Sequence, residues 1–236
     1  MISIIIPAHN EKANLERLLP ELVALPMQVL LDIIVVLSSE NTDGTEKIEG
    51  QEKVRIIKCA GKGRAIQMNA GAASAMGDVL VFLHADVRPP KSFLHDIRTA
   101  LQKGFDAGFF SYRFDNKSLW LKINASFTSR DGIFTGGGDQ CLFIQKQLFT
   151  DLGKFDENQV LMEDFEFFQR MKRNRVKYKI IKNDLIVSAR KYKNNSYLRV
   201  NLSNLLLVLL FKLGYPADKL KSLHNRLLKL PYQSNT

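Results

Sequence analysis

The sequence predicts an α/β fold, a doubly wound and mostly parallel sheet with helices on both faces, followed by a C-terminal helical hairpin. Three observations support this prediction. Short apolar runs rich in β-branched residues recur along the first third of the chain, segments of helical period separate them, and turn residues bound them. Strands and helices that alternate in this way form a parallel sheet, and right-handed crossovers bring the strand-end loops to one edge.

The order of the elements follows from the same patterns. Four runs have the composition of buried strands, at residues 2–7, 31–37, 54–58 and 79–83, and Pro7 is expected to close the first of them. Later strands are expected at 107–114, which alternates as an antiparallel strand does, and at 141–144 and 180–187. Helices are predicted at 14–24, 64–73, 91–101 and 120–129, and after Asp164.

The strand at 79–83 leads directly into His84 and Asp86, before two prolines end it. A run this apolar predicts a strand in the middle of the sheet. In open α/β sheets, ligands bind at the carboxyl ends of the strands. A carboxylate at that position can hold a hard divalent cation, which in turn can hold a phosphate. An isolated Asp would more simply cap a turn, so this interpretation depends on the rest of the chain.

Two further stretches carry candidate site chemistry. Gly61-Lys62-Gly63-Arg64 opens a helix of small residues, and such an N-terminus offers N–H groups and positive charge to a phosphate. The stretch fits neither a Walker loop nor a dinucleotide fingerprint. Three glycines at 136–138 allow a close backbone approach, and Glu163-Asp164 opens a helix, where the helix dipole alone already favours carboxylates.

The net charge of +10 is unevenly distributed along the 236 residues. Residues 172–236 hold 15 Lys and Arg but only 2 Asp and Glu, whereas the rest of the chain is slightly acidic. Such asymmetry suggests an anionic partner for the C-terminal part, and a solvated basic face is an equal alternative. Met1 leads directly into a predicted strand and Cys59 and Cys141 are the only cysteines, so we expect a cytoplasmic protein without a signal peptide.

Several ordered pieces of the chain resemble the family 2 glycosyltransferases of the GT-A fold. They are Ser3-Ile4-Ile5-Ile6-Pro7-Ala8-His9-Asn10-Glu11, Thr42-Asp43-Gly44-Thr45, Gly63-Arg64-Ala65 with Gln67-Met68-Asn69-Ala70-Gly71, Leu83-His84-Ala85-Asp86, Gly138-Asp139-Gln140 and Met162-Glu163-Asp164. The third and fourth pieces are most similar to a soluble bacterial subgroup. The resemblance spans residues 1–192, which we take as the glycosyltransferase domain, and leaves 193–236 as a basic, amphipathic helical extension.

The resemblance implies a role for each matched position. The residues that would bind the nucleotide diphosphate sugar donor are Pro7, His9, Glu11, Glu40, Asp43, Arg64, His84 and Asp86. Asp86 would end the Asp-x-Asp motif and hold Mg²⁺ or Mn²⁺, and Asp164 would be the general base, with Glu163 next in line. The residues that would face the sugar or the acceptor are Gly138, Asp139, Gln140 and Arg190.

Simple chemistry agrees with these roles. A metal ion offsets the charge of the leaving diphosphate, while a carboxylate on the other side takes the proton of an attacking hydroxyl. Because the hydroxyl attacks from the side opposite the diphosphate, the anomeric centre is inverted. Two positions depart from the family pattern. Leu37 stands where an Asp usually contacts the nucleotide, with Glu40 as the candidate replacement, and His84 stands for the first Asp of the metal motif.

Three other functions remain open at this point. A nucleotidyltransferase would share the sheet and the metal but would carry a Gly- and Lys-containing loop directly after the first strand, which residues 8–11 do not supply. A nucleotide-sugar binding protein without transfer activity is suggested by Leu37, but binding alone does not need Asp164. A nucleic-acid binder is suggested only by the basic tail, without a recognition motif, and we expect no nucleic-acid partner.

The C-terminal extension is predicted to form two helices, at 198–213 and from Pro216 to 230. The stretch from Leu205 to Phe211 is apolar all round and too short to span a bilayer. The second helix mixes a leucine stripe with lysines and arginines, the pattern of a helix on an anionic surface. We expect a hairpin beside the acceptor side of the cleft that joins two subunits, touches the inner membrane face near a lipid-linked acceptor, or only covers its own domain.

Single residues outside the motifs are expected to be structural. His95 and His224 are predicted to be surface histidines, because neither has a ligand partner in helical register. Cys141 lies in an apolar strand and is assigned to the core, as are Trp120 and Phe127, which share one face of a predicted helix.

Overall fold

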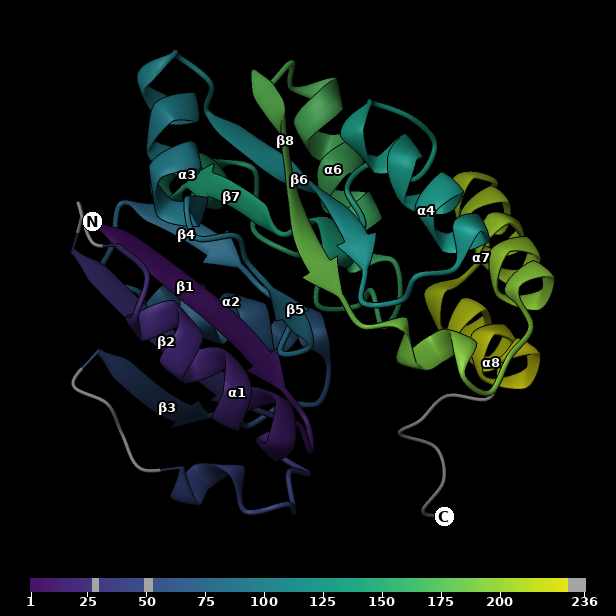
Figure 1. Ribbon diagram of the computed structural model, residues 1–236, viewed down its shortest axis with the longest axis horizontal. Coiled ribbons are helices and arrows are strands. Elements are labelled where there is room, and N and C mark those ends of the chain that lie inside the picture. Colours follow the sequence, from purple (N-terminus) through teal and green to yellow (C-terminus); the bar gives the residue numbers. More distant parts are fainter. Residues whose placement is uncertain (27–29, 49–52, 229–236) are drawn as a thin grey trace.

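The computed structural model describes residues 1–26, 30–48 and 53–228. One eight-stranded sheet, in the order β3-β2-β1-β4-β7-β6-β8-β5, runs through the molecule. Figure 1 shows β1 to β3 on one side of it and the C-terminal helices on the other. The strands are β1 (Ile2–Ala8), β2 (Leu31–Leu37), β3 (Val54–Lys58), β4 (Val79–Phe82), β5 (Val87–Arg88), β6 (Ala107–Phe114), β7 (Leu142–Gln145) and β8 (Tyr178–Val187).

The predicted fold class is confirmed. Strands β3, β2, β1 and β4 are parallel, as are β6 and β8, while β7 pairs antiparallel with both β4 and β6. Pro7 lies inside β1 instead of closing it, paired with Val36. The β1–β4 pairing already ends at Ile5, so the missing N–H of Pro7 removes no bond from that ladder.

Helices cover both faces of the sheet. The α-helices are α1 (Lys12–Val23), α2 (Arg64–Ser74), α3 (Phe93–Gln102), α4 (Leu119–Ser126), α5 (Lys146–Asp151), α6 (Glu163–Arg173), α7 (Tyr197–Lys212) and α8 (Ala217–Leu227). The 3₁₀ turns are η1 (Thr45–Lys47), η2 (Phe127–Ser129), η3 (Gly138–Gln140) and η4 (Ala189–Tyr192). Between β2 and β3, the described residues contain only the short turn η1.

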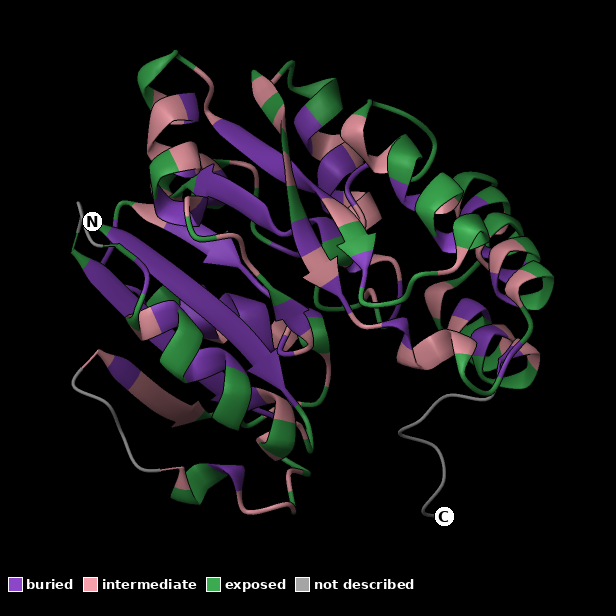
Figure 2. Cartoon of the chain, in the orientation of Figure 1, coloured by how far each residue is buried: buried purple, intermediate pink, exposed green. Residues whose placement is uncertain are grey.

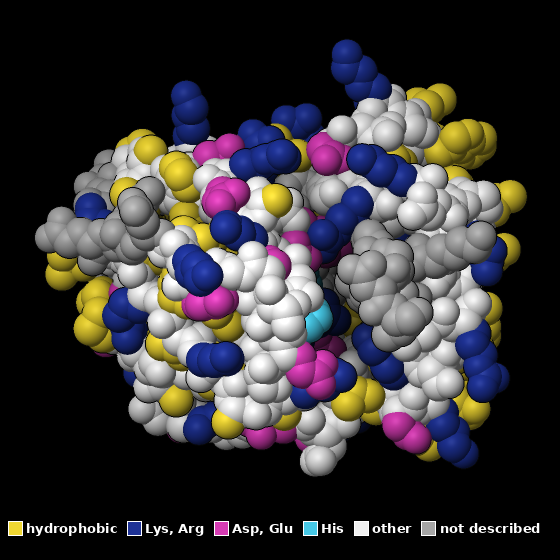
Figure 3. All heavy atoms as spheres, turned by 90° about the horizontal axis from the view of Figure 1, so that it is seen from below, with side chains coloured by type: hydrophobic (Ala, Val, Ile, Leu, Met, Phe, Trp, Pro, Cys, Tyr) yellow, Lys and Arg dark blue, Asp and Glu magenta, His cyan; other side chains and the backbone are white. Residues whose placement is uncertain are grey.

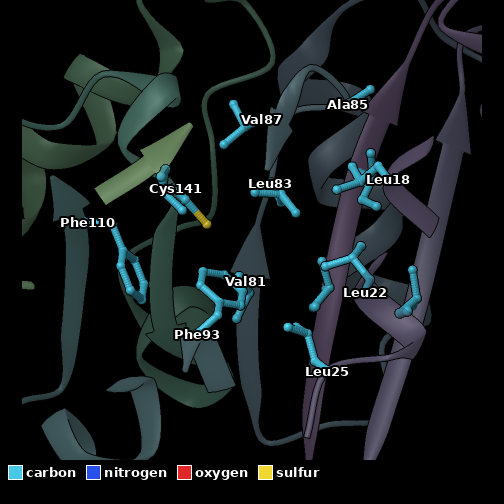
Figure 4. Packing of buried hydrophobic residues seen from close by; sticks show 14 of the residues in the cluster. Leu18, Leu22, Leu25, Val81, Leu83, Ala85, Val87, Phe93, Phe110 and Cys141 are labelled. Atoms are coloured by element: carbon cyan, nitrogen blue, oxygen red, sulfur yellow. The ribbon is translucent and has the colours of Figure 1, made fainter. Parts of the chain in front are cut away.

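Two apolar cores lie on opposite faces of the sheet. One contains leucines of α1 with residues of α3 and α4, and Figure 4 shows Leu18, Leu22 and Phe93 gathered around the strands, with Cys141 in the same cluster as predicted. The other is built by α2, α5 and α6 and includes Met68, with Phe149 and Phe167 in ring contact. Burying both faces fixes the register of the strands, and hence which side chains reach the carboxyl edge.

The α7–α8 hairpin is present, but its burial differs from expectation. Leu207 and Val208 are buried, whereas Leu198, Leu202 and Leu209 are exposed. Figure 2 shows the outer turns of α7 and α4 largely exposed. The end of the predicted second helix, at residues 229 and 230, lies outside the described residues. Within the described ranges, no helix combines the length and the apolar character needed to cross a bilayer.

Trp120 and Phe127 are also exposed, at 63% and 70%, so their assignment to the core was wrong. Helical spacing places apolar residues on one face but does not say whether that face meets the sheet or solvent. Here Leu121 and Ala125 take the sheet-facing positions of α4.

Gly71 sets the distance between α2 and the sheet. A β-carbon at this position would overlap the side chain of Ile5 and lie 3.0 Å from Cγ2 of Val36. We expect Gly71→Ala to destabilise the protein, because overpacking costs about 1–3 kcal/mol. Over most of that range the cost exceeds the gain of roughly 1 kcal/mol from placing Ala in a helix.

Urea unfolding of Gly71→Ala beside Gly132→Ala, where a β-carbon meets open space, tests this close contact. A Gly71→Ala protein as stable as the wild type would show that α2 can move away from the sheet at no cost.

Candidate active site

The candidate site is a recess at the carboxyl edge of the sheet. Strands β1, β2 and β4 end there, and the start of β7 arrives from the opposite direction with η3 before it. Helix α6 also begins here, after Met162 in the left-handed conformation with φ of 67°. Viewed from below, acidic, basic and histidine side chains gather around this hollowed part of the surface (Figure 3).

One wall is an ion-pair chain from Glu11 through Arg190 to Asp86. Nη1 and Nη2 of Arg190 donate to the carboxylate of Glu11 at 3.2 and 2.6 Å, and Nε lies 3.3 Å from Oδ2 of Asp86. Burial raises the pKa of Asp86, and Arg190 opposes that rise. Arg190 therefore links the loops after β1 and β4 to η4, and three of the predicted site residues come together.

The other predicted nucleotide contacts follow β1 and β2. Nδ1 of His9 is hydrogen-bonded to Oγ of Ser38 at 2.6 Å. Asp43 accepts from the backbone N–H of Lys12 at 2.8 Å and also binds Thr45, so its carboxylate orders the loop after β2 and the start of α1. Glu40 forms an exposed ion pair of 2.8 Å with Lys62, at the entrance to α2.

His84, Gly138 and Asp164 meet at the centre of the recess. A β-carbon on residue 138 would overlap the ring of His84 and lie 2.6 Å from Oδ2 of Asp164, so only glycine permits this approach. Nδ1 of His84 lies 3.7 Å from Oδ1 of Asp139. Burial opposes the charged form of both groups, but their mutual attraction outweighs it, raising the pKa of His84 and lowering the pKa of Asp139.

Glu163 and Asp164 have different environments although they are adjacent. The side chain of Glu163 is 1% exposed and lies 2.7 Å from Nε of Arg64, at the start of α2. Burial and the neighbouring charge of Glu163 raise the pKa of Asp164 to about 7, while Arg64 and His84 oppose the rise. Asp164 can therefore accept a proton near neutral pH, whereas Glu163 serves as the partner of a cation.

Gln140 does not face the recess, because it is buried under the loop before it. Its Oε1 accepts from the backbone N–H of Gly136 at 2.9 Å, and its Nε2 donates to the carbonyl of Thr128 at 3.1 Å. Gln140 thus holds the glycine loop in place, while Gly138 and Asp139 face His84.

Sequence reasoning missed the contribution of α8. His224 is only 6% exposed, so its assignment as a surface histidine was wrong. The imidazole lies within electrostatic reach of Lys191, Lys221 and Arg64. The available signal was the spacing of Leu220, His224 and Leu228, which places the histidine on the buried stripe of α8.

The residues that could hold a metal are few. No cluster of three or more His, Cys, Asp or Glu side chains with ligand geometry occurs in the part of the chain that the structure describes. Asp86 nevertheless fits one kind of site. Mg²⁺ commonly binds one or two carboxylates together with substrate phosphates and water, so a single carboxylate at the edge of a recess suffices.

The curated relatives of this chain include proteins named as glycosyltransferases. An undecaprenyl-phosphate 4-deoxy-4-formamido-L-arabinose transferase of Aeromonas hydrophila is 26% identical over 134 residues, 53% of this chain and 41% of that protein. The chain spans about two fifths of the length of the first curated relatives it matches.

Two solved structures share the fold. TarS residues 1–349 of S. aureus with UDP-GlcNAc has a TM-score of 0.66 at 15% identity, with 96% of this chain and 71% of that chain covered. The mannosyltransferase PcManGT of Pyrobaculum calidifontis with GDP-Man and Mn²⁺ has a TM-score of 0.65 at 17% identity, with 96% and 69% covered. The model of the glycosyl transferase family 2 matches residues 3–185, most of the chain, and the chain therefore belongs to glycosyl transferase family 2.

Proposed function

We propose that the protein is a metal-dependent, inverting glycosyltransferase that moves a sugar from a nucleotide diphosphate sugar to an acceptor hydroxyl. The observation that carries the proposal is the separation of its carboxylates. Asp86 lies on one wall beside Arg190, and Asp164 lies at the centre with a pKa raised to about 7 by burial and by Glu163. A displacement needs these two functions, an anchor for the leaving diphosphate and a base for the nucleophile.

The donor half is the wall of Glu11, Arg190 and Asp86. Related folds bind UDP-GlcNAc and GDP-Man, the latter with Mn²⁺, which supports a nucleotide sugar as donor. Asp86 would hold the divalent ion, which supplies positive charge to the departing diphosphate. Arg190 orients Asp86 and brings a further positive charge to the same wall.

The acceptor half is centred on Asp164. As the attacking hydroxyl forms its bond to the anomeric carbon, its proton passes to the Asp164 carboxylate and the bond to the diphosphate breaks. Glu163 pairs with Arg64, and burial together with the charge of Glu163 raises the pKa of Asp164, which suits Asp164 to the role of base. A single displacement of this kind inverts the anomeric centre.

We also propose that the enzyme works at an anionic membrane surface. An apolar face on α4, η2 and α7 exposes Leu119, Trp120, Ile123, Phe127, Leu198, Leu202, Leu205, Leu206, Leu209 and Leu213. Trp120 and Tyr197 are in ring contact 5.9 Å apart, which joins the two helices into one surface. A lipid-linked acceptor is consistent with this face, since one relative is named for undecaprenyl phosphate.

Charge favours a bilayer over a second copy of the chain. The charged residues within 117–130 and 197–216 are all basic, namely Lys117, Lys122, Arg130, Arg199 and Lys212. In a two-fold dimer this basic rim would face itself and repel. An anionic bilayer instead attracts Lys and Arg while it buries leucine and tryptophan.

The first test of the proposed function is the base. Asp164→Asn should lower kcat about a hundredfold or more with donor affinity retained, the usual size of a general-base contribution. In the wild type, kcat should fall as the pH drops below about 7, because protonated Asp164 cannot accept a proton. Steady-state kinetics from pH 5 to 9 measure both effects, and near wild-type turnover by the variant would contradict this role.

The second test is the metal. Asp86→Ala should weaken the binding of UDP or GDP when Mn²⁺ or Mg²⁺ is present and leave it unchanged in EDTA, because the carboxylate acts through the ion. Isothermal titration calorimetry measures this affinity for the wild type and the variant, each with metal and with EDTA. A wild-type affinity that is the same with EDTA as with metal would remove the metal from the proposal.

The third test is the membrane face. The protein should float with anionic liposomes at low salt, and Leu198→Glu/Leu202→Glu should reduce binding at least about tenfold, since burying one leucine contributes roughly 1.5–3 kcal/mol. Met76→Glu is the matched control, because Met76 is 61% exposed and precedes β4 at the opposite edge of the sheet. A protein that ignores these liposomes, or that forms a stable dimer through this face, would contradict the membrane role.

A further inference from the structure

Helix α8 places a histidine between two walls of the recess. Leu220, His224 and Leu228 follow one another at intervals of four residues, and all three are buried. Leu220 packs with Leu161, two residues before Glu163, while Leu228 packs with Val200 in a cluster against which Tyr192 of η4 also packs. His224, midway along this stripe, therefore faces the space between the start of α6 and η4.

Cations from three elements converge on this space. Lys221 lies one turn before His224 on the same side of α8, Lys191 comes from η4, and Arg64 comes from the start of α2. Lys191 donates to Oδ1 of Asn204 at 3.2 Å and Arg64 pairs with Glu163 at 2.7 Å, so both are held in position. Burial lowers the pKa of both lysines, so neither ammonium group is fully hydrated.

His224 itself has an unmet hydrogen bond. Its Nδ1 is buried and has no hydrogen-bond partner among the residues that the structure describes. Burial, followed by the charges of Lys191, Lys221 and Arg64, lowers the pKa of the imidazole to about 3, so the ring is neutral near pH 7. A buried polar atom without a partner destabilises the fold. An oxyanion placed here would accept a hydrogen bond from the imidazole and bring a negative charge to the surrounding cations.

We propose that His224, Lys221, Lys191 and Arg64 form a binding site for a phosphate group of the acceptor. The site lies on the Glu163 side of Asp164, whereas the donor wall of Glu11, Arg190 and Asp86 forms a separate ion-pair chain. When its phosphate is held here, the acceptor would place its attacking hydroxyl near Asp164. This assignment rests on the proposed function, but the site makes its own binding prediction.

The test is phosphate binding to the full chain, measured by calorimetry without turnover. Inorganic phosphate is titrated into protein already saturated with UDP or GDP and Mn²⁺, so that the donor wall is filled. Phosphate should still bind, and Lys221→Gln should weaken it about tenfold or more, the usual effect of losing a charge-assisted hydrogen bond. Lys219→Gln is the matched control, because it removes the same charge from an exposed position of α8 and should leave binding unchanged.

A second readout follows the histidine directly. In nitrogen-15 spectra, phosphate should shift the imidazole signals of His224 and raise its pKa, and His224→Leu should weaken phosphate binding. Because Lys221 is partly exposed, the Lys221→Gln variant should still fold. It therefore tests the site even if His224→Leu fails to fold.

Three results would overturn the site. The first is an equal phosphate affinity of the wild type and of both the Lys221→Gln and the Lys219→Gln variants. The second is an imidazole signal of His224 that does not shift when phosphate is added. The third is loss of phosphate binding once UDP or GDP is present. The last result would assign the cations to the donor diphosphate. Failure of the proposed function would appear separately, as transfer that survives Asp164→Asn while phosphate binding is intact.

Discussion

The contact between Arg64 and Glu163 is the interaction on which the site depends. Two adjacent carboxylates at one helix start repel each other, and burial raises the cost of charging either. Arg64 forms its ion pair with Glu163, and burial together with the charge of Glu163 raises the pKa of Asp164 to about 7, although Arg64 opposes that rise. The same ion pair joins the start of α2 to the start of α6, two helices on one face of the sheet. It therefore also fixes the position of Asp164, the candidate base, relative to α2.

The sheet and most helices could be predicted because their signals are local. Apolar runs and helical spacing depend on neighbours in the sequence, and so do the strand ends that bring Asp86 and Glu11 to one edge. The roles of Asp43 and Gln140 could not be predicted. Their carboxylate and amide are used by backbone groups of nearby loops, and only the folded path of those loops shows that these polar side chains are already engaged.

The C-terminal hairpin shows the other limit of sequence patterns. Its helices were predicted, but the burial of His224 and the exposure of Leu202 were not. A period shows which residues share a face, whereas the choice between core and solvent depends on which partner that face meets. In this fold α8 meets the loop before α6 through Leu161, so a histidine in the middle of its buried stripe is drawn into the recess.

The two-residue strand β5 has a consequence for engineering this fold. It pairs Val87 and Arg88 with Val187 and Ile186 of β8, directly after Asp86 and three residues before Arg190. Backbone hydrogen bonds thus set the spacing between that carboxylate and its guanidinium, and a slip of one residue would turn the side chains of one strand to the other face. A chimera that replaces the segment around β5 must therefore take β8 from the same parent, however distant the two are in the sequence.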